Sequence, residues 1–406
     1  MVYSGINLGN VKVSNRSSIL KLLNDCGAMS RKDIAQSLGL TPATVTLICT
    51  ELLDAGLLEE KGEMEEEKRA GRRKILIDIN YEYRLVLSIC IEAARTFIAI
   101  CDLKGRPRAK LESATDGAAA PEEFLRQTAD KAKSLMWEMN IGKDEILGVG
   151  VSIPGIISRG TGVSHHAYRI WNEPVNVGEC LSRCLDLPVI VENNVKAFAE
   201  GELIYGCGKE QENLLFIKWG PGVGSAIIIN GRIYDSRNSK TAEIGHYIVE
   251  KDGKLCRCGR RGCLETKVAL HAVADRVREA CTRESMPVLY AKVNGDVSRI
   301  EARNISSWFD TADRGLRSVT DEIIDQLAQV AVNTVTMLAP DRVIVYGEMF
   351  DLPDMVGRFT RACAHYDPSY GEGCILKSDL GEKIGYIGPV AVVVREMFLM
   401  SGYGEE

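Results

Sequence analysis

The chain has 406 residues, of which 45% are hydrophobic and 26% charged, and its formal net charge is −6 at pH 7. At about 150 residues per domain, this length corresponds to two or three domains of a soluble globular protein. No apolar run approaches the roughly 20 residues of a membrane span, and the N-terminus lacks the apolar core of a secretory signal. We therefore expect a cytoplasmic protein without membrane association.

The chain contains 13 cysteines. Secreted disulfide scaffolds are small and dense in cysteine, whereas this chain is long and its cysteine count is odd. The count therefore favours reduced thiols, some of which belong to a metal site.

The first 80 residues carry 11 Lys and Arg against 11 Asp and Glu, so the rest of the chain holds the whole net charge. Within this neutral segment, residues 68–74 contain five cations. Such a run on its own is typical of a solvated loop. The pattern that precedes it points instead to a contact with nucleic acid.

Three helices are predicted in this segment. Residues 14–25 show apolar residues at helical spacing, Ser30 is a good N-cap for a second helix, and Thr41 followed by Pro42 begins a third. The turn at Gly39-Leu40 gives the last two helices the spacing of a helix-turn-helix. Strands after Leu57 and over 74–79 would form a wing, so we expect a winged helix-turn-helix DNA-binding domain over residues 1–80.

The alternative is a small helical bundle that touches no DNA. If the domain does bind DNA, the third helix offers only weak base readout, because residues 43–50 contain no Lys, Arg, Asn or Gln. Phosphate contacts and a minor-groove contact by the wing would then supply much of the affinity. The residues expected to contact DNA are Ser30, Arg31, Lys32, Thr44, Thr46, Arg72 and Arg73.

From residue 81 the pattern changes to α/β. Buried strands are predicted over 85–91 and 96–101, followed by a turn, and the same arrangement recurs over 214–218 and 225–230. This internal repeat indicates two related α/β lobes.

The most specific motif lies in the second lobe. Glu243-Ile244-Gly245-His246 is followed by Cys256-Arg257-Cys258-Gly259-Arg260-Arg261-Gly262-Cys263-Leu264-Glu265. Three cysteines within ten residues and a nearby histidine match a Cys₃His zinc site, and the two glycines permit tight turns between the ligands. The alternative is a set of reduced structural thiols.

Together with Ser152-Ile153-Pro154-Gly155, Glu192-Asn193-Asn194 and Gly222-Val223-Gly224, this motif resembles the ROK family of repressors, open reading frames and sugar kinases. The resemblance covers residues 81–400. It implies an N-terminal winged helix-turn-helix followed, over residues 81–406, by a two-lobed actin-like (ribonuclease H-like) ROK sugar-kinase fold.

The resemblance also assigns site residues. It implies that His246, Cys256, Cys258 and Cys263 bind one structural Zn²⁺ per chain, and that Asn193, Glu243, His246 and Glu265 line the sugar pocket. Amide and carboxylate groups suit sugar hydroxyls as hydrogen-bond partners. The alternative for Glu243 and Glu265 is that they are ordinary surface carboxylates.

Three departures from the kinase members argue against phosphoryl transfer. The Asp-x-Gly-Gly-Thr phosphate loop of the kinases is replaced by residues 90–94, Cys-Ile-Glu-Ala-Ala. Asn194 stands where the kinases have the Asp that takes the proton from the sugar hydroxyl, and Asn is not a base. Pro221 removes an N–H donor from the second phosphate loop.

We therefore expect no catalytic residues and a sugar-responsive transcriptional regulator that acts as a repressor of carbohydrate-utilisation genes. Its expected partners are operator DNA, a sugar or sugar-phosphate effector, and a second copy in a homodimer or a dimer of dimers. Two alternatives stay open: an active ROK sugar kinase that carries a DNA-binding domain, and a DNA anchor controlled by a protein partner.

Overall fold

A computed structural model describes residues 8–63, 75–209, 211–235, 241–309, 312–371 and 373–401. The chain divides into two compact units, residues 1–205 with 383–406 and residues 206–382. Among the described residues, no helix is both long and apolar enough to cross a membrane.

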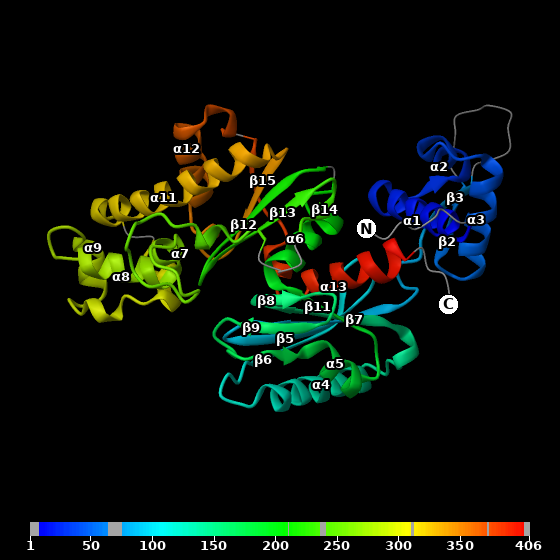
Figure 1. The fold of residues 1–406 in the computed structure, drawn as a ribbon, viewed down its shortest axis with the longest axis horizontal. Coiled ribbons are helices and arrows are strands. Elements are labelled where there is room, and N and C mark those ends of the chain that lie inside the picture. Colours follow the sequence, from blue (N-terminus) through cyan, green and yellow to red (C-terminus); the bar gives the residue numbers. More distant parts are fainter. Residues whose placement is uncertain are drawn as a thin grey trace. The chain divides into compact units, whose positions relative to one another are not determined.

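The first elements of the first unit form a winged helix-turn-helix, as predicted (Figure 1). Helix α1 begins at Leu8, six residues before the expected start, and residues 8–13 contain no proline that would prevent this extension. The three strands form an antiparallel sheet with the order β1-β3-β2. The elements are α1 (Leu8–Cys26), β1 (Met29–Ser30), α2 (Arg31–Leu38), α3 (Pro42–Asp54), β2 (Leu58–Glu63) and β3 (Ile75–Ile79).

Side-chain caps set the ends of α2 and α3. The Ser30 hydroxyl accepts a hydrogen bond from the backbone N–H of Asp33 at 3.2 Å, and Thr41 accepts one from Thr44 at the same distance. Gly39 ends α2 in the left-handed conformation, with φ at 64°. These caps confirm the helix boundaries predicted from the sequence.

The rest of the first unit is built on a five-stranded sheet with the order β11-β7-β4-β5-β6. Helices α4 and α5 lie on one face of this sheet, and α6 and α13 lie on the other (Figure 1). A small three-stranded sheet, β10-β9-β8, completes the unit. The elements are β4 (Leu85–Ile91), β5 (Arg95–Cys101), β6 (Pro107–Ala114), α4 (Pro121–Glu138), β7 (Ile146–Ile153), β8 (Gly155–Ser158), β9 (Val163–Ala167), β10 (Val175–Asn176), α5 (Val177–Leu185), β11 (Val189–Asn193), α6 (Asn194–Tyr205) and α13 (Ile387–Val393).

The second unit repeats this topology. Its sheet has the order β16-β15-β12-β13-β14, with parallel and antiparallel neighbours in the same places as in the first sheet. The two hairpins predicted from the sequence repeat are β4–β5 and β12–β13. The elements are β12 (Leu214–Trp219), β13 (Val223–Ile229), β14 (Arg232–Ile233), α7 (Glu265–Val268), α8 (Leu270–Ala280), α9 (Pro287–Lys292), α10 (Ile305–Trp308), α11 (Arg314–Leu338), β15 (Arg342–Tyr346), α12 (Met355–Tyr366) and β16 (Ile375–Lys377).

The end of the chain returns to the first unit. Every residue of α13 is buried, and the helix packs on α6 and on strands β7 and β4. It continues into a π-helical segment, η7 (Val394–Met400), which contacts α1. There the Ser17 hydroxyl donates a buried hydrogen bond to the Leu399 carbonyl at 2.7 Å. The C-terminal segment therefore links the α/β part of this unit to its DNA-binding part.

Candidate functional site

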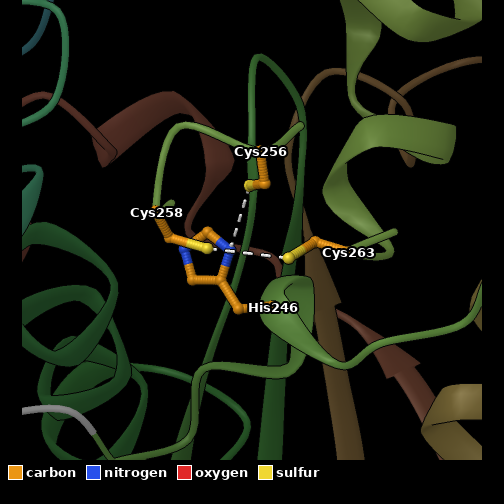
Figure 2. A group of neighbouring side chains, drawn as sticks. All are labelled: His246, Cys256, Cys258 and Cys263. Atoms are coloured by element: carbon orange, nitrogen blue, oxygen red, sulfur yellow. Dashed lines mark hydrogen bonds between the residues drawn. The ribbon is translucent and has the colours of Figure 1, made fainter. Parts of the chain in front are cut away.

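The four predicted metal ligands lie together in the second unit (Figure 2). His246 ends a short 3₁₀ helix, and the three cysteines come from the loop that precedes α7. One ligand atom from each of the four lies within 4.8 Å of the others. The sequence spacing thus identified a cluster that the fold assembles.

The distances within the cluster fit a tetrahedral zinc site. The Cys256 Sγ lies 3.6 Å from His246 Nδ1, and the Cys258 Sγ lies 3.6 Å from the Cys263 Sγ. With Zn–S near 2.3 Å and Zn–N near 2.0–2.1 Å, a tetrahedron has S–S and S–N edges of roughly 3.6–3.8 Å. Both the donor set and its spacing therefore fit Zn²⁺.

The backbone of the loop depends on two glycines at positive φ. Gly259 has φ at 84° and Gly262 has φ at 72°, both in the left-handed region. The Cys256 N–H donates to the Arg260 carbonyl at 2.7 Å, which closes the turn between the first two ligands. A Cβ at position 262 would collide with the Glu250 carbonyl oxygen, whereas one at position 259 would meet nothing within 4 Å.

The protonation preferences of two ligands suit metal binding. Burial lowers the pKa of His246, which favours the neutral imidazole that binds metals. Burial alone would raise the pKa of Cys258, but hydrogen bonds from Arg260 and with the thiols of Cys263 and Cys256 together lower it. Burial raises the pKa of Cys256 and Cys263, so these two thiols are the harder ones to ionise.

Both predicted sugar-binding carboxylates, Glu243 and Glu265, lie close to residues of this cluster. Glu243 precedes the His246 turn, and its Oε2 lies 3.9 Å from His246 Nε2. Glu265 begins α7 two residues after Cys263, and its Oε2 accepts a hydrogen bond from the Val223 N–H at 3.2 Å. Because Glu265 lies only two residues after Cys263, the conformation of the loop that carries this cysteine fixes where the carboxylate lies.

The fourth predicted sugar residue, Asn193, belongs to the first unit. Its Oδ1 accepts hydrogen bonds from the N–H groups of Val195 and Lys196, and its Nδ2 donates to the Gly155 carbonyl at 2.8 Å. Asn193 thus caps α6, and its sugar contact stays a prediction.

Two residues that the sequence predicts at the positions of the kinase phosphate loop and base, Glu92 and Asn194, meet in the first unit. Glu92 lies in the tight turn between β4 and β5, where its N–H donates to the Arg95 carbonyl at 2.9 Å. The Asn194 Nδ2 donates to the Glu92 Oε1 at 2.8 Å. Sequence comparison with the kinases singled out both positions separately, but it did not predict that the two side chains bind each other.

The first unit also contains an ion cluster that the sequence did not reveal, and one of its members, Glu192, lies two residues before Asn194. The half-buried Arg159 binds Glu200 at 2.7 Å, Glu396 at 3.0 Å and Glu192 at 3.1 Å. Burial raises the pKa of Glu192 to about 7, even though Arg159 acts to lower it. Glu192 and Glu200 lie close together along the sequence, but Arg159 and Glu396 lie far from both, so the sequence did not indicate that these four residues meet.

The residues predicted to contact DNA differ in how far they are exposed on the winged helix. Lys32 and Thr46 are exposed, Arg31 and Thr44 are half-buried, and Arg31 lies 3.6 Å from Glu60. Ser30 is buried, and its hydroxyl also donates to the Asp33 carboxylate, so it serves the α2 cap. The remaining two predicted contacts, Arg72 and Arg73, lie outside the described residues.

Comparisons with known proteins match both parts of the chain. Residues 88–396 match the ROK family, and residues 14–59 match a winged helix-turn-helix DNA-binding model. The chain is 26% identical to the N-acetylglucosamine repressor of Escherichia coli O6:H1 over 404 residues, which covers 96% of this chain and 95% of the repressor. It is 30% identical to a glucokinase of Halalkalibacterium halodurans over 281 residues, 67% of this chain and 83% of the kinase.

A solved structure shares the whole fold. A ROK family transcriptional regulator, described as a homologue of the Escherichia coli MLC protein, superimposes with a TM-score of 0.78 at 19% identity and covers 97% of this chain and 98% of its own. The kinase matches 67% of this chain, whereas the repressor and the regulator match 96% and 97% of it. From the long family match, the chain belongs to the ROK family.

Proposed function

We propose that this protein is a sugar-responsive DNA-binding repressor whose kinase site is degenerate. The observation that carries the proposal is the fusion of a winged helix to a ROK domain in which Glu92 and Asn194 have replaced the phosphate loop and the base. The full-length relatedness to the N-acetylglucosamine repressor supports the same conclusion.

The zinc proposed for the Cys₃His cluster is structural. His246, Cys256, Cys258 and Cys263 would supply all four ligands of a tetrahedral ion, which would leave no position for a catalytic water. Zn²⁺ would hold the loop in one conformation and contribute to its folding. In this role the loop positions Glu243 and Glu265, which we assign to sugar hydroxyls.

DNA binding is assigned to the exposed faces of α2 and α3. Lys32 and Arg31 lie in the first turn of α2, where they would contact phosphates, and Thr46 and Leu47 are exposed on α3, where they would face base edges. In a homodimer, two such helices would read two half-sites at a fixed spacing.

The sugar response follows from differential binding. An effector changes DNA affinity only if it binds the DNA-competent and DNA-incompetent conformations unequally. The C-terminal segment offers a physical connection within the first unit, because Glu396 belongs to the Arg159 cluster and Leu399 accepts the hydrogen bond from Ser17 of α1. A movement of β11 or α6 would therefore reach the winged helix.

The main alternative function is a sugar kinase that carries a DNA-binding domain, and the similarity to a glucokinase is the observation that favours it. It requires a phosphate loop and a base. In this chain the Glu92 carboxylate lies at the position of the phosphate loop, and the Asn194 amide stands at the position of the base. The two side chains are hydrogen-bonded to each other.

The experiment that tests the proposal measures DNA affinity with and without sugars. The zinc-loaded full chain would be used to select fragments of its source genome, and its affinity for the selected DNA would be titrated against salt and a panel of sugars. We expect nanomolar binding that a sugar weakens by at least about tenfold, or 1.4 kcal/mol. DNA binding that no sugar changes would favour control by a protein partner instead, and absence of DNA selection would refute the regulator.

A further inference from the structure

The turn between β4 and β5 bears a negative charge at the place where the kinases of the family hold phosphate. In those kinases the phosphoryl group passes from this turn to a sugar hydroxyl beside the catalytic base. The corresponding residues here are Glu92 and Asn194, and their side chains lie 2.8 Å apart. A phosphate attached to that hydroxyl would have to share this space with the Glu92 carboxylate.

The structure holds Glu92 in this place through its backbone. The Glu92 N–H donates to the Arg95 carbonyl at 2.9 Å, and the Glu92 carbonyl accepts a hydrogen bond from the Thr115 hydroxyl at 2.8 Å. The Thr115 hydroxyl is in turn 2.8 Å from that of Thr96, which is buried. Hydrogen bonds therefore hold both the backbone N–H and the backbone carbonyl of Glu92.

The donors at the start of α6 are already in use. A helix N-terminus attracts anions through its unpaired N–H groups. At α6, the Asn193 Oδ1 accepts hydrogen bonds from the N–H groups of Val195 and Lys196, and the Asn194 amide donates to Glu92. The Asn193 side chain thus occupies these backbone donors of α6, and the Asn194 side-chain donor is occupied by the Glu92 carboxylate.

We propose that Glu92 is a specificity-determining residue that restricts the effector to unphosphorylated sugars. The inference rests on the proposed sugar response and narrows its ligand class. A phosphate monoester carries about −1.5 to −2 charges at pH 7, so it is repelled by Glu92, whereas a free hydroxyl can donate a hydrogen bond to the same carboxylate. The Glu92–Asn194 pair thereby turns a phosphate-binding place into a hydroxyl-binding one.

The test compares each sugar with its own phosphate. Isothermal titration of the zinc-loaded full chain would use glucose, N-acetylglucosamine, mannose and N-acetylmannosamine, each beside its 6-phosphate, at fixed ionic strength. We expect a free sugar to bind at least about tenfold more tightly than its phosphate, which is about 1.4 kcal/mol. Raising the salt concentration should narrow this ratio, because the repulsion is screened.

Glu92→Gln is the decisive variant, since its amide oxygen can still accept the hydrogen bond from Asn194. It should narrow the ratio of the two affinities by about tenfold, because the repulsion of the phosphate is removed and the hydroxyl of the free sugar loses a charged hydrogen-bond acceptor. Glu138→Gln is the matched control, because it removes one carboxylate from the far end of the same unit. Glu138 is the last residue of α4 and precedes Ile146, which pairs with Leu85 at the start of β4. Glu92 follows the opposite end of β4, so the two carboxylates belong to opposite ends of this strand.

The outcomes separate this inference from the proposed function. A phosphorylated sugar that binds wild type as tightly as its free partner, or more tightly, would overturn the role of Glu92 and leave the sugar response intact. An unchanged ratio in Glu92→Gln would overturn it as well. Binding of no sugar in either form would overturn the sugar response itself.

Discussion

Cys258 is the proposed metal ligand whose loss best separates the sugar response from DNA binding. It is half-buried, so Cys258→Ser removes one thiolate with little loss of packing. We expect the zinc content measured by elemental analysis to fall well below one ion per chain, and the sugar response to disappear because the loop no longer positions Glu265. DNA binding should persist, since the winged helix lies in the other unit.

Cys374→Ser provides the control, because Cys374 is also a half-buried cysteine of the second unit but lies outside the cluster. It should retain zinc and the sugar response. Wild-type protein purified without chelator and found free of zinc would rule out the metal site. A normal sugar response in zinc-free Cys258→Ser would show that the loop does not position the pocket.

Glu192 gives the first unit a pH-dependent stability. Burial raises the pKa of this carboxyl from 4.5 to about 7, so the folded state binds a proton that the unfolded state has already released between these pH values. The free energy of unfolding should therefore fall as the pH rises from about 4.5 to 7, by up to about 3 kcal/mol.

Glu192→Gln should flatten this dependence, because the amide does not titrate. Chemical denaturation at several pH values would measure it, and Glu138→Gln, which changes an exposed carboxyl, should keep the wild-type slope. Equal slopes in Glu192→Gln and wild type would assign the pH dependence to other groups.

At the scale of an element, the zinc loop depends on two glycines with unequal constraints. Both have positive φ, so alanine at either position carries backbone strain of about 1–2 kcal/mol. At Gly262 the added methyl group would also collide with the Glu250 carbonyl oxygen, whereas at Gly259 it meets open space.

Gly262→Ala should therefore lose zinc at a chelator concentration that Gly259→Ala withstands. A competition titration with a chromogenic chelator would measure the zinc affinity of each variant, and the wild-type protein provides the upper limit of that affinity. Equal zinc affinity in the two variants would mean that the loop relaxes around position 262 without disturbing its ligands.

The wing is the element of the DNA-binding domain with the most basic sequence. Replacing Arg72 and Arg73 by Ala should weaken operator binding and lower the slope of log affinity against log salt by about one unit for each phosphate that the wing no longer neutralises. Lys131→Ala with Lys133→Ala removes the same charge from α4 and should leave both quantities unchanged. An unaltered slope in the arginine variant would make residues 68–74 a solvated loop.

For the whole molecule, we expect no sugar kinase activity. Loss of a general base alone lowers the rate by about 10²–10⁴, and Glu92 and Pro221 remove phosphate-binding features in addition. A coupled assay of ADP release with ATP and the sugar panel should stay at the level of a no-enzyme control. Sugar-dependent turnover at an ordinary rate would replace the repressor proposal by the kinase alternative.

The sequence determined the features that depend on neighbouring residues. The N-termini of α2 and α3 follow from Ser30 and Thr41, and the C-terminus of α2 follows from Gly39, because a cap acts within one helical turn. The Cys₃ motif marked the metal cluster because three of its ligands lie within eight residues, and the repeated strand pairs marked both hairpins.

Only the tertiary structure decided the contacts between segments that are distant along the chain. Glu92 and Asn194 are 102 positions apart, Arg159 and Glu396 are 237 apart, and Ser17 and Leu399 are 382 apart. No local propensity encodes such pairs; they form because apolar strands and the fully buried α13 must pack together, and that packing brings their polar neighbours within hydrogen-bond distance. The sequence therefore determined the Cys₃His cluster and the fold, and the tertiary packing decided that Glu92 meets Asn194 and that the end of the chain contacts α1.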